Sequence, residues 1–293
     1  MYRVTALILA MLTIPACAGV KKPTVLSFTT NDDGMVIGPI TLGGAVRAHV
    51  IVDSGAGLDV FAPSLIEKLH GKPAGQFTGF RMTGERLDVP LFVIAEIRVG
   101  PVVRKKAQVA GWTVFDELHF DGIISVGDFR EQAFTLDFSN KQIVFENVQS
   151  LAQRLRAGVV APLKFDDYRG IALDLFSPFL IGSEPALCSL DTGSPNSTFS
   201  LRYMALLGLN QDDPNVTKRV SKNIAGVTTT RYIASVPHIA LAADPIIRRM
   251  QPKVEFADII YDCVLGIDFW SGRSLTIDIP HERLIVSRAT TAR

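Results

Sequence analysis

Hydrophobic positions along the chain fall in short runs that are rich in Val, Ile, Leu, Phe and Thr and are separated by Gly, Pro or Asp. Residues 89–99, 134–138 and 232–240 are examples. Runs of this length and composition are typical of β-strands. The pattern therefore predicts a mainly β protein.

The N-terminal run differs from the others. Residues 4–14 are apolar and uncharged, too few to span a hydrocarbon core of about 30 Å, which needs about 20 residues. They are typical of a signal peptide, which we predict over residues 1–18. Cys17 is either the lipidated residue of a sequence that resembles a bacterial lipobox, or part of an A-x-A site cleaved after Ala18. A buried N-terminal strand is the remaining alternative, whereas both processing routes predict export.

The chain contains an internal repeat. Residues 51–56 recur as residues 189–194, so that Asp53 and Asp191 stand 138 positions apart in matching motifs. Further on, residues 121–129 recur as residues 262–269 in the same order, with one residue extra in the first copy. A shared order of separate motifs predicts two similar folding units.

The repeat also predicts the domain organisation. We expect an N-terminal lobe over residues 24–148 and a C-terminal lobe over residues 159–293, both within the ordinary size of a domain. Residues 149–158 are polar and carry Arg154 and Arg156, so they are interpreted as the linker between the lobes.

Each copy of the first motif ends an apolar run with Asp, a small hydroxyl residue and Gly. One such tripeptide is usually only a turn. Two copies related by a pseudo-twofold axis would bring Asp53 and Asp191 together, and carboxylates that close share a proton. Such a pair can act as acid and base and activate a water. The hydroxyls of Ser54 and Thr192 can brace the loops by hydrogen bonds to the backbone.

The paired motifs resemble those of two-lobed aspartic proteases of the pepsin/retropepsin type. Asp53-Ser54-Gly55 and Asp191-Thr192-Gly193 match the family's D-[ST]-G signature. Val264-Leu265-Gly266 matches its apolar-apolar-Gly element, and Ile123-Ile124-Ser125 is the weaker counterpart, with Ser125 where Gly is expected. The resemblance covers residues 35–146 and 173–287.

The resemblance implies an all-β fold of two duplicated retropepsin-like β-barrel lobes with a substrate cleft between them. It implies an aspartic endopeptidase in which Asp53 and Asp191 are catalytic, with Ser54, Gly55, Thr192 and Gly193 in supporting roles. The alternative is a catalytically inert envelope binding or scaffold protein on the same fold. Ser125 favours this alternative, and the retention of both Asp residues favours the enzyme. An enzyme that needs processing or a partner is a third hypothesis.

The family closes a β-hairpin flap over its substrate. The resemblance places flap candidates within residues 80–86 and 223–228, although two ordinary hairpins would give the same pattern. The flap candidates are Thr83, Gly84, Ala225 and Gly226.

The resemblance also bears on the cysteines. In the family fold the strands that carry Cys188 and Cys263 run side by side, and an exported protein meets an oxidising environment. The two residues are therefore expected either to form a disulfide or to be buried free thiols.

Composition and charge exclude several classes of function. The chain has 293 residues, with 30 Lys and Arg against 29 Asp and Glu, for a net charge of +1. A nucleic-acid-binding protein would usually carry a basic excess. Five His and three Cys are too few and too scattered for a typical zinc site, and no HExxH, CxxC, GxGxxG or P-loop motif occurs.

The sequence also gives expectations for cofactors, partners and location. We expect no cofactor and no metal, and a peptide or protein substrate rather than a nucleic acid. The membrane would be contacted only through a lipid anchor at Cys17. A monomer that is periplasmic or anchored to the envelope is predicted.

Overall fold

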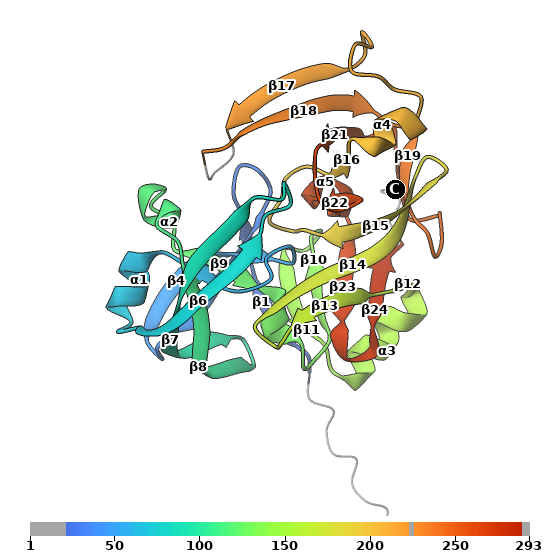
Figure 1. The fold of residues 1–293 in the computed structure, drawn as a ribbon. Helices are drawn as coiled ribbons and strands as arrows, with labels where there is room; N and C mark the ends of the chain where they lie inside the picture. The colour runs from blue at the N-terminus through green and yellow to red at the C-terminus, as the bar shows by residue number, and fades with distance from the viewer. Residues whose placement is uncertain (1–21, 223–225, 289–293) are drawn as a thin grey trace, which may run out of the picture.

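The computed structural model describes residues 22–222 and 226–288. Most of these residues are in β-strands, which form three sheets, so the prediction of a mainly β protein is confirmed. Figure 1 shows the N-terminal half, blue to green, beside the C-terminal half, yellow to red. The predicted signal peptide and Cys17 lie outside the described residues.

One sheet of eight strands belongs to the N-terminal half. β3 (Val36–Leu42) also pairs with β7 (Arg86–Val99), so the sheet curves back on itself. In spatial order the strands are β2 (Thr29–Thr30), β3 (Val36–Leu42), β4 (Val46–Asp53), β9 (Gly122–Ser125), β5 (Val60–Phe61), β8 (Val102–Gly111), β7 (Arg86–Val99) and β6 (Lys72–Phe80).

A sheet of ten strands belongs to the C-terminal half. Nine of them are, in spatial order, β17 (Thr217–Lys222), β18 (Thr228–Ser235), β21 (Lys253–Ala257), β16 (Thr198–Ser200), β22 (Cys263–Leu265), β15 (Glu184–Leu190), β14 (Ala172–Ile181), β19 (His238–Leu241) and β20 (Arg248–Met250). The tenth, β13 (Lys164–Tyr168), pairs with β14 outside this order.

A third sheet joins the halves. Its six strands are, in spatial order, β1 (Thr24–Ser27), β11 (Gln142–Phe145), β10 (Phe134–Asp137), β23 (Ser274–Asp278), β24 (Arg283–Ser287) and β12 (Gly158–Pro162). The halves meet where β10 pairs with β23, with Thr135 directly opposite Thr276. The hydroxyl oxygens of these two threonines lie 2.7 Å apart in a buried hydrogen bond. The halves therefore share a sheet and are not joined by the chain alone.

The helices are short and lie between strands. They are α1 (Pro63–Lys68), α2 (Val114–Glu117), α3 (Val148–Ala157), α4 (Arg202–Leu206) and α5 (Ile267–Trp270), with 3₁₀ turns at Val126–Phe129 and Ile279–His281. The expected linker between the lobes is almost entirely α3. Asn147 and Ser150 cap this helix reciprocally, each side chain accepting the backbone N–H of the other residue.

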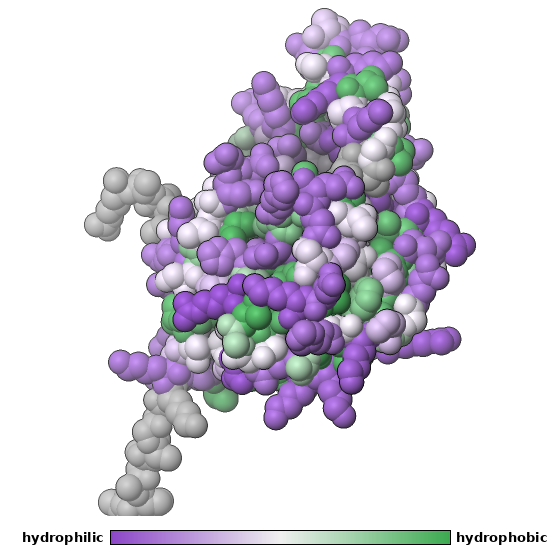
Figure 2. Space-filling model, turned by 90° about the vertical axis from the view of Figure 1, so that its left-hand side faces the viewer, coloured by the Kyte–Doolittle hydropathy of each residue, from purple (hydrophilic) through white to green (hydrophobic). Residues whose placement is uncertain are grey.

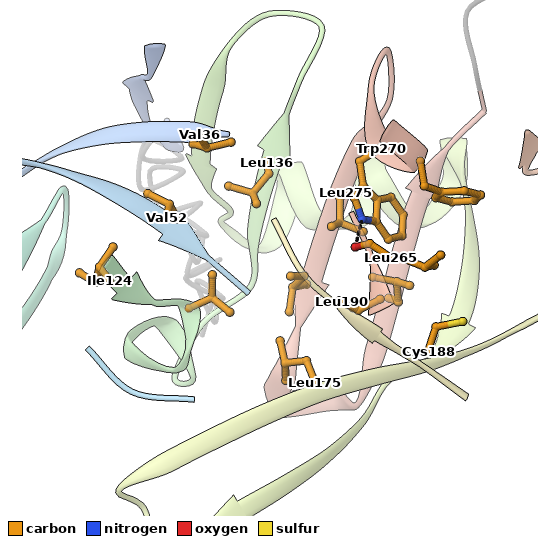
Figure 3. Packing of buried hydrophobic residues seen from close by; sticks show 14 of the residues in the cluster. Val36, Val52, Ile124, Leu136, Leu175, Cys188, Leu190, Leu265, Trp270 and Leu275 are labelled. Atoms are coloured by element: carbon orange, nitrogen blue, oxygen red, sulfur yellow. Dashed lines mark hydrogen bonds between the residues drawn. The ribbon is translucent and has the colours of Figure 1, made fainter. Parts of the chain in front are cut away.

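Buried apolar side chains run through both halves as one core (Figure 3). Val52 and Leu190, which lead into the two aspartates, are fully buried. The core explains why these runs are apolar, because the strands that end at the aspartates pass through it. Figure 2 shows polar side chains over most of the face of the N-terminal half, with small, separate apolar areas between them. No helix among the described residues is long and apolar enough to cross a membrane.

Candidate functional site

The two aspartates stand at the ends of equivalent strands. β4 runs parallel to β9 and places Asp53 beside Ser125. β15 runs parallel to β22, with Leu190 beside Leu265, and Asp191 follows directly. The structure therefore brings the two D-[ST]-G motifs to the junction between the halves.

Four reciprocal hydrogen bonds lock the two aspartate loops together. The Ser54 hydroxyl donates to the Leu190 carbonyl and the Thr192 hydroxyl donates to the Val52 carbonyl, both at 2.8 Å. The backbone N–H of Ser54 donates to Thr192 Oγ1 at 3.0 Å, and that of Thr192 donates to Ser54 Oγ at 3.1 Å. Both hydroxyl side chains are fully buried. Each half thus satisfies the polar groups of the other.

Gly55 and Gly193 allow the carboxyl groups to approach the opposite loop. A Cβ at Gly55 would lie 2.5 Å from Asp191 Cγ, and a Cβ at Gly193 would clash with the Asp53 carboxyl group. The Gly55 N–H donates to Asp53 Oδ1 at 2.7 Å, and the Gly193 N–H donates to Asp191 Oδ1 at 2.9 Å and to Asp53 Oδ1 at 3.2 Å. These positions need glycine for space and not for a special backbone angle.

Burial raises the pKa of both aspartates. The pKa of Asp191 is raised well above its ordinary value, first by desolvation and then by the charge of Asp53. Burial also raises the pKa of Asp53, but the N–H of Gly55 and a hydrogen bond with Asp191 oppose that shift. With one proton shared between them, the two carboxyls offer one donor and several acceptors.

Ser125 fits the N-terminal half without disturbing this geometry. Its N–H donates to Asp59 Oδ1 at 2.8 Å, and its hydroxyl oxygen accepts the Gly127 N–H at 3.1 Å. The equivalent Gly266 has no such room, because a Cβ there would lie 2.6 Å from the carbonyl carbon of Asn196. The departure from the family pattern is thus accommodated locally.

Sequence reasoning missed a buried ion pair behind Ser125. The Asp59 side chain is fully buried and pairs with Arg104 at 2.9 Å, and Arg104 also pairs with Asp128. Burial raises the pKa of Asp59, and the positive charge of Arg104 opposes this shift. The sequence alone did not distinguish Asp59 from a turn residue, because its partner Arg104 lies 45 positions away on β8.

The β6–β7 hairpin reaches from the N-terminal half to the C-terminal half (Figure 1). The Ile260 N–H donates to the Met82 carbonyl at 2.9 Å. The Met82 side chain packs on the buried cluster of Ala257, Ile259 and Val264. We call residues 81–85 at the tip of this hairpin the lid.

The flap candidates fall in different surroundings. Thr83 and Gly84 form part of the lid, and Gly84 has a φ of +78° in its turn, which favours glycine. Gly226 is exposed, with no atom near the place of a Cβ. Ala225 lies outside the described residues.

The remaining candidates concern cysteines and metals. Cys188 and Cys263 form a disulfide that joins β15 to β22, with their Cα atoms 4.6 Å apart. No cluster of three or more His, Cys, Asp or Glu with metal-binding geometry occurs within residues 22–222 and 226–288.

Comparisons with known proteins concern the fold. No protein-family model matches the chain, and no curated protein sequence matches it. The structure is similar to that of basic 7S globulin from soybean, with a TM-score of 0.54 and 10% identity over 92% of this chain and 95% of the globulin. It is also similar to conglutin gamma, a basic 7S globulin from lupine seeds, with a TM-score of 0.53 and 10% identity over 91% and 95%. The chain shares the fold of these globulins.

This similarity corrects two expectations. The chain was expected to be a member of the active aspartic proteases and to be an aspartic-type endopeptidase, but these structural neighbours are seed globulins rather than proteases. The prediction was wrong because it treated the D-[ST]-G motifs as marks of catalysis. In the structure the hydroxyls and glycines of these motifs hold the halves together, and a protein that cleaves nothing needs that role equally.

Proposed function

We propose that the chain is a catalytically inert binding protein that holds an extended polypeptide segment between its two duplicated lobes. The segment would lie between the lid and the loops that carry Asp53 and Asp191. Following the sequence expectation, we place this binding protein in the bacterial envelope.

The lid is the observation that carries the proposal. Its tip contacts the opposite half through the hydrogen bond from the Ile260 N–H to the Met82 carbonyl and through the packing of the Met82 side chain. A hairpin tip can release from such contacts and close again over a bound chain. Strand-like segments gain affinity from main-chain hydrogen bonds to such hairpins.

A hydroxyl in the lid supports this use. Thr83 Oγ1 is buried and has no hydrogen-bond partner among the described residues. A buried polar atom without a partner costs stability. A bound chain would supply that partner.

The aspartate pair suits the binding of a backbone amide. Burial raises the pKa of both carboxyls, so a proton shared between them gives the pair a donor and acceptors at one place. A peptide group also carries one donor and one acceptor. The pair can therefore hold a bound chain by hydrogen bonds alone.

The proposal is tested by incubating the full chain with a mixed library of unstructured peptides from about pH 4 to 7.5, the range in which a carboxyl pair titrates. Complexes are separated by gel filtration, and mass spectrometry shows whether the peptides are intact. We expect wild type and Asp53→Asn both to retain a subset of intact peptides. Peptides cut by wild type and not by Asp53→Asn would overturn the proposal, and so would the absence of any retained peptide.

A crosslinked lid provides the control. In the double variant Met82→Cys with Ile260→Cys, oxidation should fix the lid to the opposite half and abolish peptide retention. A mild reductant should cleave this crosslink and restore peptide retention. The Cys188–Cys263 disulfide should stay intact, because both of its cysteines are fully buried. Equal retention in both states would place the bound peptide outside the covered region.

A further inference from the structure

A pocket on the C-terminal half lies next to the lid, because Ile260 lines it and donates its N–H to the Met82 carbonyl. It has a volume of about 620 Å³. Phe165, Phe176 and Tyr261 contribute aromatic walls, and Leu163, Leu187 and Ile260 extend the apolar lining. Tyr261 and Phe176 pack edge to face, with ring centroids 5.4 Å apart. A pocket of this size and lining is typical of ligand sites and accommodates a long side chain.

Tyr261 connects the pocket to the cleft. Burial raises the pKa of its hydroxyl, and the charges of Asp174 and Asp191 add to the shift. The Tyr261 ring also packs on the same buried cluster as Met82 of the lid. A side chain of a polypeptide bound under the lid can enter the pocket from the cleft.

The rim of the pocket is acidic. Asp166, Asp262 and Glu282 line it, against the single cation Lys164 among its lining residues. Asp262 is already engaged by Arg202 and by the Leu187 N–H. Within the described part of the chain no ion pair joins Asp166 or Glu282 to a basic residue. The pocket thus presents unneutralised negative charge next to aromatic faces.

The pocket residue Asp166 belongs to a like-charge pair. Asp166 on β13 stands directly opposite Asp174 on β14. Like charges opposite each other on neighbouring strands destabilise a sheet. A cation placed between them would remove the repulsion.

We propose that this pocket receives a Lys or Arg side chain of the bound polypeptide, with its stem along Phe176 and Tyr261 and its charge beside Asp166. Aromatic faces and carboxylates both attract such cations, whereas a neutral aliphatic chain gains only from the walls. The inference rests on the proposed function, because it names the class of ligand for the same cleft.

The test uses fluorescence anisotropy with the full chain and labelled peptides that differ at one position. A peptide retained in the library experiment is made with Lys, Arg, norleucine or Glu at each position in turn. Norleucine matches the aliphatic stem of Lys without its charge. At one position we expect Lys and Arg to bind about tenfold more tightly than norleucine, and Glu more weakly still.

Variants locate the effect. Asp166→Asn should reduce the preference for Lys over norleucine at least threefold, and Glu117→Gln, an exposed acid on α2, should leave it unchanged. Norleucine binding as tightly as Lys at every position would overturn this inference while leaving the proposed function intact. Failure of every peptide to bind would overturn both. A preference for Lys that Asp166→Asn does not alter would place the cation elsewhere and overturn the assignment of this pocket.

Discussion

The two halves secure their aspartate loops with different chemistry. In the N-terminal half, Asp59 accepts the Ser125 N–H and is neutralised by Arg104, which also pairs with Asp128. This arrangement places two carboxylates behind one loop and depends on a single guanidinium. The loop is therefore held by a cluster of ionic groups, and its stability depends on their charges.

The C-terminal half uses a neutral residue at the equivalent place. Ser197 stands where the other half has Asp59, and its hydroxyl donates to Asp268 at 2.6 Å. The Gly266 N–H donates to the same hydroxyl oxygen at 3.2 Å. No second carboxylate has to be neutralised, and the disulfide supplies an additional covalent link.

The N-terminal half could not adopt that disulfide. The positions that match the two cysteines are Val50 and Gly122. Gly122 has a φ of +145°, and a Cβ there would clash with the Val60 carbonyl oxygen. Similar strand arrangements are thus stabilised by charge in one half and by a covalent bond in the other.

Removal of Arg104 should have the largest effect on stability. Arg104→Met leaves Asp59 and Asp128 without their counter-charge, and breaking a buried pair from one side costs about 3–5 kcal/mol of unfolding free energy. Urea denaturation at neutral pH measures the loss. Part of it should be recovered as the pH falls and the carboxyls protonate, whereas a loss below 1 kcal/mol that does not depend on pH would refute the ionic account.

Loss of the disulfide should have the next largest effect. The bridge links residues 75 positions apart, and a disulfide typically contributes about 2–4 kcal/mol to the free energy of unfolding. The double variant Cys188→Ala with Cys263→Ala should therefore lose hydrogen-exchange protection in β15 and β22. Protection in β4 and β9 should change less, and an equal loss in both pairs of strands would show that the halves do not differ in this respect.

The reciprocal hydroxyls should give smaller and matched effects. Ser54→Ala and Thr192→Val each remove one buried donor and one acceptor, for a loss of about 1–3 kcal/mol. The double variant should cost less than the sum, because both hydroxyls serve the same network. Thermal unfolding of the two single variants and the double variant completes a double-mutant cycle. Strictly additive losses of unfolding free energy would contradict a shared hydrogen-bond network.

The smallest effect is expected at Asp174. Burial and the nearby Asp166 raise its pKa to about 6. The folded state therefore binds this proton more tightly than the unfolded state, so this residue lowers stability as the pH rises from about 4 to about 6. After discounting for its partial exposure, Asp174→Asn should stabilise the protein by about 1 kcal/mol above that range and have no effect below about pH 3.5. Unfolding curves at both extremes test the sign.

Some of this structure was predictable from the sequence for a physical reason. Strand runs and D-[ST]-G motifs are local patterns of consecutive residues. Hence the mainly β structure was predictable, and the residues that meet between the halves could be named in advance. The Asp59–Arg104 pair and the attachment of Met82 to Ile260 were not predictable, because they depend on tertiary contacts between residues without a shared motif.

The predicted activity shows a different limit. The motif of Asp53 and Asp191 serves two purposes, to hold the halves together and to place two carboxyls side by side. Sequence reasoning inferred chemistry from the second purpose, but the first is sufficient to explain the hydroxyls of Ser54 and Thr192.

The sheet shared by β10 and β23 has a consequence for ligand entry. The halves cannot move apart without breaking this ladder, so a ligand that binds as proposed would enter by release of the lid. If the closed lid is favoured by about 2 kcal/mol, the open form is populated at a few per cent. The apparent affinity for any ligand would then be weaker than the intrinsic one by the same factor, and a substitution in the lid could tighten binding without touching the ligand.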